Sequence, residues 1–379
     1  MWRRYRDVRV RVALLVCGAL VGLLAFASSG SAAVTQLGSL TADSPIAASD
    51  GWVVWSAQSP DGWQLTAWHA GVVTTLPVAT RPEPFDVSLG TDAQGRMVAT
   101  YSRCAVTPSD SYGDTVPAWS GRDCRVYVLE LASGQEHAAP IPHPAGVSDT
   151  FPSMWRGRIA FARYEPAHPD AAQIELWTPG SSTLRTLPAG PMPTRCPITT
   201  GCAGQPRVGA VDGLSLNGQL VSFRWFVIVP AVRGHSGWEI RADRLSDGQS
   251  MLAGSGFDGE VCEGGIDTIE PYVPVNTGHR VLFGQSTDNC YAQTVELLDF
   301  DTLTQRTLGA RLTVSGQIIE MTSNGDSLFA LVAPQPTRYT APTCSTPGAP
   351  CLLEQITIPT LDRPVGPAIT PFPVPVPVG

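Results

Sequence analysis

The stretch Asp149-Thr-Phe-Pro-Ser-Met-Trp-Arg-Gly-Arg-Ile-Ala-Phe-Ala-Arg163 contains the pattern that decides the fold. An apolar approach segment leads to a Gly-containing turn, and the turn leads to a second apolar strand. This pattern recurs six times, and each copy is followed by a strand, a turn and another strand before the next copy begins. Repeats of roughly 45 to 60 residues that contain only strands are typical of propellers. The sequence therefore predicts an all-β fold, a six-bladed β-propeller of four-stranded antiparallel blades.

The turns inside the repeats support this prediction. Asn-Gly, Asp-Gly and related pairs supply the positive φ angles that tight hairpins need. Five of the six inner turns contain such a pair or a close variant, and the copy at Arg156-Gly157 keeps the Gly. The predicted second strands that follow these turns are 52–56, 97–101, 158–161, 220–223, 281–283 and 328–332.

The segment 149–163 and the segment Ser49-Asp-Gly-Trp-Val-Val-Trp-Ser56 resemble the WD40-like repeats of TolB-type six-bladed propellers. In those repeats an approach with a Pro precedes an Asp-Gly-type turn and an I-x-F strand, and the likeness extends over nearly all of the chain after residue 33. The family's Ser-Pro-Asp-Gly turn is not intact at any inner turn. Its one literal copy, Ser59-Pro60-Asp61-Gly62, falls between the second and third strands of the first repeat. The amino-terminal domain that accompanies the propeller in TolB is also missing, so the resemblance implies the fold and not membership of that transport complex.

The chain begins with the features of an export signal. A basic segment with five Arg is followed by the uncharged apolar stretch 12–27 and by the small residues Ser31-Ala32-Ala33. We therefore expect a signal peptide at 1–33, a propeller domain at 34–369 and a Pro-rich tail at 370–379. The expected location is secreted or extracytoplasmic, in the cell envelope. Either Val34–Leu40 or the Pro-rich end would supply the strand that closes the ring.

Cysteine usage agrees with an oxidising compartment. Of the nine Cys, Cys17 lies in the predicted signal, and the other eight form an even set that favours disulfides. Pairing within each repeat is the most economical arrangement, although the count alone allows 105 connectivities. The expected pairs are Cys104 with Cys124, Cys196 with Cys202, Cys262 with Cys290, and Cys344 with Cys351.

The charge balance limits the class of partner. The chain has 25 Lys and Arg against 33 Asp and Glu, and loss of residues 1–33 would make it still more acidic. Such a chain is a poor candidate for binding nucleic acid or for inserting into an anionic membrane after signal cleavage. The expected partner is an unidentified envelope or extracellular protein, or a glycan.

Propeller topology predicts where a ligand would bind. The second-to-third connections and the blade exits share one face, here called the loop face, and every Cys of the predicted pairs falls on it. The other hairpins share the opposite face, here called the turn face. Polar and acidic residues near the starts of the first strands should surround the channel mouth on the loop face, where they could bind a cationic group or Ca²⁺. Alternatively, these carboxylates cap backbone amides or face water. The residues are Asp43, Asp86, Asp149, Asp212, Glu270 and Gln317.

A second acidic cluster lies in the exit loop beside Cys262. Three neighbouring Gly residues would allow the loop to wrap tightly around an ion, and Ca²⁺ is the only cofactor that the sequence suggests. The cluster lacks the regular spacing of a calcium loop. Its members are Asp258, Glu260, Glu263 and Asp267.

No catalytic motif is present in the sequence. His143, His168 and His235 lie near long loops and could act as bases, although a surface or structural role is the more common one. The favoured function is a non-catalytic scaffold that binds a protein or another ligand through its disulfide-rich loop face. Two alternatives stay open: a hydrolase or lyase that acts on a polysaccharide with carboxylates at the channel mouth, and a structural repeat protein with a filled channel.

Overall fold

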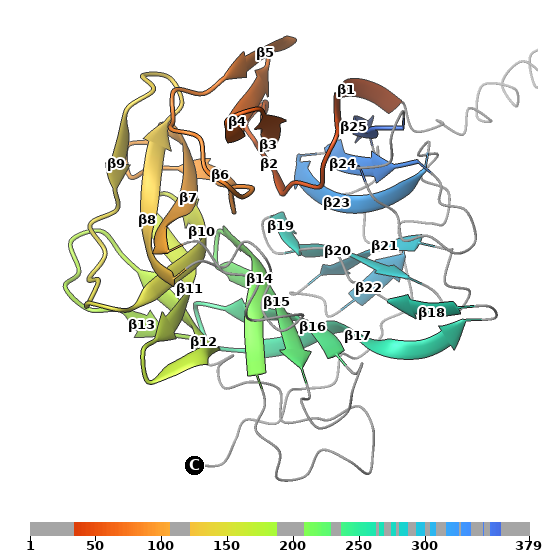
Figure 1. Ribbon diagram of the computed structural model, residues 1–379. Coiled ribbons are helices and arrows are strands. Elements are labelled where there is room, and N and C mark those ends of the chain that lie inside the picture. Colours follow the sequence, from red (N-terminus) through yellow and green to blue (C-terminus); the bar gives the residue numbers. More distant parts are fainter. Residues whose placement is uncertain are drawn as a thin grey trace, which may run out of the picture. The chain divides into compact units, whose positions relative to one another are not determined.

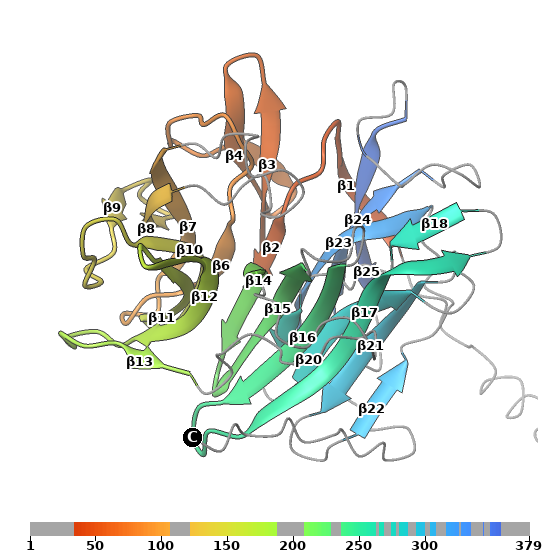
Figure 2. The same ribbon diagram turned by 60° about the horizontal axis from the view of Figure 1, so that its bottom comes forward.

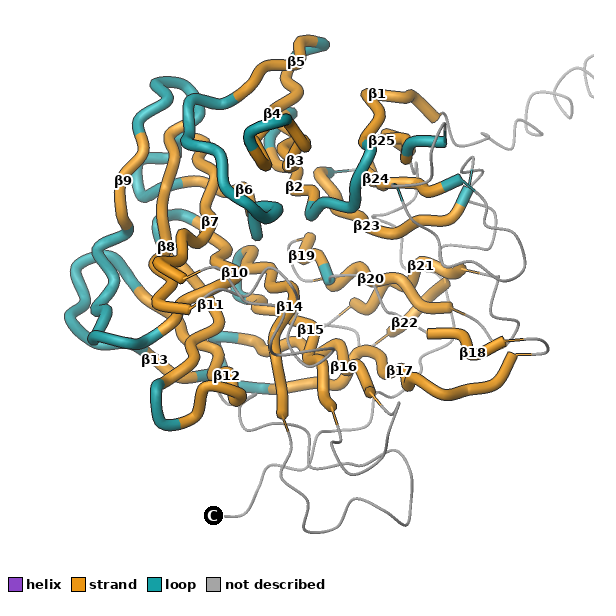
Figure 3. Tube along the Cα trace, viewed as in Figure 1, coloured by secondary structure: helices purple, strands orange, loops and turns teal. Residues whose placement is uncertain are grey.

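The structure is a computed structural model that describes residues 34–106, 122–187, 208–228, 236–262, 265–268, 274–277, 280–286, 293–299, 304–307, 316–325, 327–334, 344 and 349–357. The chain divides into two compact units, Met1–Ala33 and Val34–Gly379, and every described residue belongs to the second. Figure 3 shows only strands and loops in this part of the chain. Across the described ranges, no helix has the length and apolar character needed to cross a bilayer.

Four separate four-stranded sheets surround a common centre in Figure 1. Within each sheet the strands pair antiparallel. The first sheet contains β2 (Ile46–Ser49), β3 (Trp52–Ser59), β4 (Gly62–His69) and β5 (Val72–Thr75). The second contains β6 (Ser88–Thr91), β7 (Met97–Val106), β8 (Arg122–Glu130) and β9 (Glu136–Ala138). Another contains β19 (Val275–Thr277), β20 (Arg280–Ser286), β21 (Gln293–Asp299) and β22 (Thr304–Thr307). The last contains β23 (Gln317–Asn324), β24 (Ser327–Ala333), β25 (Cys351–Thr357) and β1 (Val34–Leu40).

The remaining strands form one nine-stranded sheet, part of which is visible in Figure 2. Its first antiparallel set is β10 (Ser148–Trp155), β11 (Arg158–Glu165), β12 (His168–Trp177) and β13 (Arg185–Thr186). Its second set is β14 (Val208–Asn217), β15 (Leu220–Ile228), β16 (Ser236–Arg244) and β17 (Ser250–Cys262), with β18 (Gly265–Thr268) beside β17.

The number of blades differs from the prediction. The sequence predicts six blades, whereas the structure is an all-β propeller with five. The difference arises where β12 and β14 run parallel and pair at Ala171 and Gly209, because this contact joins the third and fourth repeats into one hydrogen-bonded sheet. The antiparallel strand pairs within each of these two repeats are nevertheless retained.

Two-residue hairpins form where Gly was expected. The turns Asp50-Gly51 and Arg156-Gly157 have positive φ at both positions, with 46° and 77° in the first and 49° and 78° in the second. This backbone matches the twist of the flanking strands. The literal Ser-Pro-Asp-Gly copy also forms a hairpin, in which Gly62 has φ 117° and a Cβ there would lie 2.5 Å from the Arg81 carbonyl oxygen. Only Gly can occupy that position without a backbone shift.

The ring is closed by the first described strand. β1 pairs antiparallel with β25, from Val34 opposite Ile356 to Leu40 opposite Cys351. Leu40 is 5% exposed and belongs to a core cluster that spans the last and first sheets, together with Ile46, Trp55 and Leu331. Of the two ring-closing strands left open by the sequence, the structure therefore uses Val34–Leu40; the Pro-rich end lies outside the described residues.

Apolar clusters fill the space between neighbouring sheets, and polar side chains tie the sheets together near the centre. In several places a side chain of one repeat accepts a hydrogen bond from a backbone amide in or near the first strand of the next repeat. Such bonds satisfy buried amides and contribute about 1 kcal/mol each. The acceptor and amide pairs are Ser56 Oγ with Phe85 (2.8 Å), Asp86 Oδ2 with Phe151 (2.8 Å), Ser153 Oγ with Leu216 (2.9 Å) and Ser215 Oγ with Asn276 (3.0 Å).

Two of the expected disulfides lie within the described residues. Cys104 in β7 is bonded to Cys124 in β8, and Cys344 is bonded to Cys351 at the start of β25. Both connect the second and third strands of a repeat, as the loop-face assignment predicts. Cys196, Cys202 and Cys290 and the side chain of Cys262 lie outside the described residues, so those two pairings stay predictions.

Candidate binding channel

A cavity of about 530 Å³ lies where the first strands meet. Its wall contains residues from β2, β6, β10, β14, β19 and β23, which surround the centre of Figure 1. The loop-face end of the wall includes Pro45 and Pro274, and the turn-face end includes Ser49, Trp155 and Asn324. A volume of this size is typical of sites for small molecules.

The wall is rich in neutral hydrogen-bonding groups. Five of the six first strands are edge strands, since β2, β6, β10, β19 and β23 each pair with one neighbour only, whereas β14 pairs with both β12 and β15. Edge strands leave a row of backbone N–H and C=O groups without ladder partners. Hydroxyl and amide side chains add to these groups; they belong to Ser49, Ser88, Thr91, Ser153, Ser215, Asn217, Asn276, Thr322, Ser323 and Asn324. The channel can therefore offer both donors and acceptors to a ligand.

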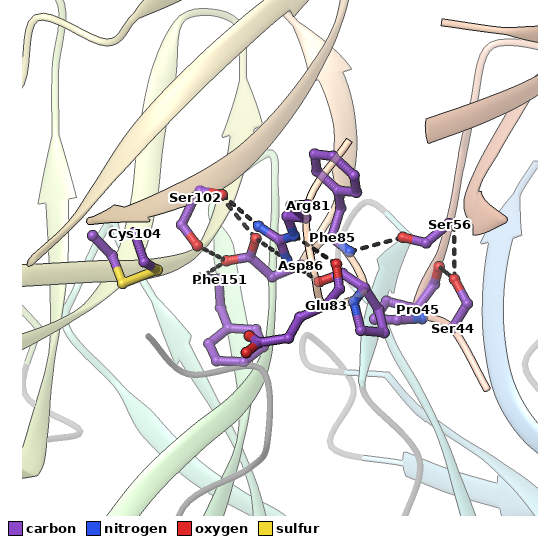
Figure 4. A network of polar contacts seen from close by, with 12 residues as sticks. Ser44, Pro45, Ser56, Arg81, Glu83, Phe85, Asp86, Ser102, Cys104 and Phe151 are labelled. Atoms are coloured by element: carbon purple, nitrogen blue, oxygen red, sulfur yellow. Dashed lines mark hydrogen bonds and ion pairs between the residues drawn. A yellow bond between two sulfur atoms is a disulfide. The ribbon is translucent and has the colours of Figure 1, made fainter. Parts of the chain in front are cut away.

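Asp86 is the predicted mouth carboxylate that lines this cavity, and its oxygens already have several partners (Figure 4). Oδ1 accepts a hydrogen bond from Ser102 N at 2.9 Å, and Oδ2 accepts from Ser102 Oγ at 2.6 Å and from Phe151 N at 2.8 Å. The Arg81 guanidinium lies 3.7 Å from Oδ1. Asp86 thus links β7 and β10 to the exit of the first repeat.

Arg81 and Glu83 hold the segment that leads into β6. Arg81 donates to the carbonyl oxygens of Ser102 (2.6 Å), Glu83 (2.9 Å) and Pro84, and its Cζ lies 4.3 Å from the centre of the Phe85 ring. Burial lowers the pKa of Arg81 despite the nearby Asp86. Burial also raises the pKa of the Glu83 carboxyl to about 7, and Arg81 opposes this rise only in part.

Asp149 forms a buried charged cluster away from the cavity wall. It lies opposite Arg163 in the β10–β11 register, and Arg163 Nε and Nη2 donate to its two oxygens at 2.7 and 2.8 Å. His143 Nδ1 lies 2.9 Å from Asp149 Oδ2, while the buried His143 Nε2 has no hydrogen-bond partner and lies 3.6 Å from Asp123 Oδ1. Asp149 and Arg163 are 1% and 6% exposed, so they form a buried structural ion pair between β10 and β11.

For the other predicted mouth residues, the structure describes the side chain of Asp43 only. Asp43 accepts a hydrogen bond from Cys344 N at 2.9 Å and thereby fixes the segment before β2 to the last repeat. Asp212 lies at the register shift between Val211 and Gly213 in β14, and Gln317 begins β23, but neither side chain is described. Glu270 lies outside the described residues. For Asp43 and Asp86, the observed bonds are those of the amide-capping alternative.

The predicted metal cluster falls on the hairpin of β17 and β18. Asp258 pairs with Thr268 and Glu260 with Asp267 in the strand register, whereas their side chains and all of Glu263 lie outside the described residues. Among the described residues, the group of potential metal ligands that lie close together is Asp43, Cys344 and Cys351. Both sulfurs of that group form a disulfide, which makes it unsuitable for a metal. Binding of Ca²⁺ at the β17–β18 hairpin stays a prediction.

The sequence analysis did not predict some residues of the channel region. Arg81 and Glu83 lie in the segment Arg81-Pro-Glu-Pro-Phe85, where two Pro residues signal an extended loop but not a buried guanidinium. Trp155 could have been found, because it is the last residue before the expected Arg156-Gly157 turn. Its position at the end of a first strand places it at the turn-face rim.

The sheet arrangement defines the class of the protein as an all-β propeller. No family model and no curated protein matches the sequence. Similar solved structures include TolB from Acinetobacter baumannii, with 10% identity and a TM-score of 0.40 over 81% of this chain and 63% of that one. An oligogalacturonate lyase in complex with manganese matches with 10% identity and a TM-score of 0.43, over 88% and 95% of the two chains. A putative gluconolactonase matches with 13% identity and a TM-score of 0.43, over 87% and 92%. The chain thus spans less than two thirds of the TolB structure.

Proposed function

We propose that this chain is an extracytoplasmic, non-catalytic propeller that binds a small hydroxyl-rich ligand, of the mono- or disaccharide type, in its central channel. The observation that supports this proposal is the cavity of about 530 Å³, with its wall of strand edges, hydroxyls and amides. Sugars offer many donors and acceptors on a compact frame, and the strand edges, hydroxyls and amides of such a wall can satisfy them. The charged residues of the wall are Asp86, Arg280 and Glu320. The sequence left open whether the partner is a protein or a glycan, and this proposal chooses the glycan.

The hydrogen bonds of Asp86 and Asp149 favour binding over catalysis at these two carboxylates. A glycosidase needs two carboxyl groups that are free to exchange protons or attack the sugar. Asp86 accepts from three donors, and Asp149 is held by Arg163 at both oxygens. Using either carboxylate in a reaction would leave buried donors without partners, at a cost of several kcal/mol.

The proposed location rests on the two disulfides. Bonds of this kind persist in oxidising compartments and are rare in the cytosol. Both join second and third strands on the loop face, where they restrict the connections around the channel entrance. Each contributes about 2 to 4 kcal/mol by limiting the unfolded chain. The loop face is thus the proposed side of ligand entry.

The proposal is tested by calorimetric titration of residues 34–379 with a panel of neutral monosaccharides and disaccharides. Ser49→Trp places a bulky group in the channel wall, and Ser49 has no side-chain hydrogen bond to lose in the described region. Thr74→Trp, on the exposed strand β5, is the matched control. We expect at least one sugar to bind, Ser49→Trp to weaken its affinity at least tenfold, and Thr74→Trp to leave it unchanged.

Thr322→Val removes a wall hydroxyl at constant volume and serves if Ser49→Trp does not fold. It should weaken binding about fivefold, in line with the loss of one hydrogen bond. Absence of binding across the panel, or equal affinity for the wild type and both wall variants, would contradict the proposal.

A further inference from the structure

Two guanidinium groups flank the indole of Trp155 at the turn-face rim of the channel. The Cζ atoms of Arg156 and Arg158 lie 4.7 and 5.0 Å from the centre of the Trp155 ring. Trp155 ends β10 and lines the cavity, Arg156 occupies the hairpin turn, and Arg158 begins β11 opposite Trp155. Each contact is in the range of a cation–π interaction. One side of the rim therefore carries two positive charges.

Neither charge is neutralised by a described carboxylate. Arg81, Arg96, Arg103 and Arg163 each have a carboxylate oxygen within 4 Å, whereas no ion pair involves Arg156 or Arg158 in the part of the chain that the structure describes. The polar contact of the Arg158 side chain is a bond from Nη2 to the Gly218 carbonyl at 2.5 Å. Burial lowers the pKa of the Arg158 guanidinium, and no nearby carboxylate opposes this effect. Arg156 and Arg158 are thus two neighbouring cations, both against Trp155, with no carboxylate partner among the described residues.

The backbone holds these cations in place. Arg156 has φ 49°, a left-handed conformation that costs energy for a side chain other than Gly, Asn or Asp. The equivalent positions of two other tight turns hold Asp50 and Ala70. Gly157 N donates to Thr91 O at 2.9 Å, and a Cβ at Gly157 would meet Ala93 N at 3.0 Å. The turn is therefore fixed against the neighbouring sheet, and the strained position holds a cation that gains no ion pair in return.

We propose that Arg156 and Arg158, held around Trp155, bind an oxyanion of the ligand that occupies the channel. A carboxylate or a phosphate group would satisfy the planar donor forks of the two guanidinium groups. The inference rests on the proposed function for the rest of the ligand, since the hydroxyls and amides of the wall would bind hydroxyl groups and the rim would bind the anion. The predicted class of ligand is thus an acidic sugar, either a uronate or a sugar phosphate.

The test compares four probes on residues 34–379 at low and high salt: glucose, glucuronate, glucose 6-phosphate and inorganic phosphate. We expect glucuronate or glucose 6-phosphate to bind about tenfold more tightly than glucose, as one charge-assisted contact allows, with the preference reduced by salt. The choice between the two acidic sugars identifies the source of the oxyanion. Equal affinity for glucose and both acidic sugars would overturn the inference.

Variants assign the preference to the rim. The Arg156→Gln/Arg158→Gln pair should abolish the preference for the acidic sugar and leave glucose binding intact, while the lysine pair Arg156→Lys/Arg158→Lys should retain part of it. Arg125→Gln, an exposed residue of β8, is the matched control. A preference that survives in the glutamine pair would overturn the inference.

If no variant binds glucose but phosphate binds in an arginine-dependent manner, the channel proposal fails and the oxyanion site stands. Arg156→Gln alone, at an exposed turn position, serves if the double variant does not fold.

Discussion

At the residue scale, we expect Glu83 to make the stability of the fold sensitive to pH. Burial raises the pKa of its carboxyl from the usual 4.5 to about 7. The folded state therefore holds the proton more tightly than the unfolded state, so the stabilising effect is complete below about pH 4.5 and is lost as the pH rises through about 7. Glu83→Gln cannot ionise and should melt at a higher temperature than the wild type at about pH 8, and at the same temperature at about pH 4.

The size of this effect is limited by solvent. The Glu83 side chain is only half-buried, which screens its charge, so the shift in melting temperature should be small. Melting curves followed by circular dichroism at both pH values provide the measurement. The exposed Asp61→Asn is the control. If the melting temperatures of Glu83→Gln and the wild type differed by the same amount at both pH values, ionisation of Glu83 would be excluded as the cause.

Asp86 illustrates how one carboxylate supports several repeats. Asp86→Ala removes the acceptor for Ser102 N, Ser102 Oγ and Phe151 N and leaves the Arg81 guanidinium without its carboxylate. Loss of a buried charged partner typically costs about 3 to 5 kcal/mol. We expect urea unfolding to show a loss of that size, against less than about 0.5 kcal/mol for the exposed Asp61→Ala. A loss below about 1 kcal/mol would mean that water replaces these bonds.

At the scale of the strand, close approach of first strands depends on Gly90. A Cβ at this position in β6 would lie 1.7 Å from the Met154 carbonyl oxygen in β10. Gly90→Ala must therefore push two strands of the channel wall apart, which should cost at least about 2 kcal/mol in the free energy of unfolding. Gly38→Ala, in β1, meets no atom within 4 Å and is the control. Similar urea midpoints for the two variants would show that β6 and β10 can move apart at little cost in stability.

Strand identity followed from the sequence because alternating apolar residues and Gly turns are local signals. The tight turns at Gly51 and Gly157 were expected from those residues, and the structure has positive φ at both. The pairing of Val34–Leu40 with β25 could not be decided, because strand pairing across more than 300 residues leaves no local pattern. The same limit explains the blade count, since the pairing of Ala171 with Gly209 joins two repeats that the sequence separates.

The candidate site was less predictable than the fold. Positions near the starts of the first strands predicted both Asp86 and Asp149 at the channel mouth; Asp86 lines the cavity, whereas Asp149 pairs with Arg163 instead. A carboxylate that binds a ligand and one that satisfies a neighbouring amide or guanidinium look alike in a sequence. The partners of Asp86, which include Arg81 and Phe151, lie in different repeats and become visible only in the folded chain.

At the scale of the whole molecule, ligand binding requires the six first strands to act together as one wall. No single strand has enough polar groups to hold a ligand, and the ring of contacts from β2 through β6, β10, β14, β19 and β23 back to β2 provides them jointly. A ligand in the channel should therefore stabilise every repeat at once. Binding on an outer strand would affect one repeat alone.

Hydrogen–deuterium exchange of residues 34–379, with and without the tightest-binding sugar of the panel, tests whether the six first strands bind the ligand together. We expect protection on binding to be concentrated in the first strands, around the whole ring: β2, β6, β10, β14, β19 and β23. Protection confined to outer strands such as β5 or β9, or no change at saturating sugar, would contradict it.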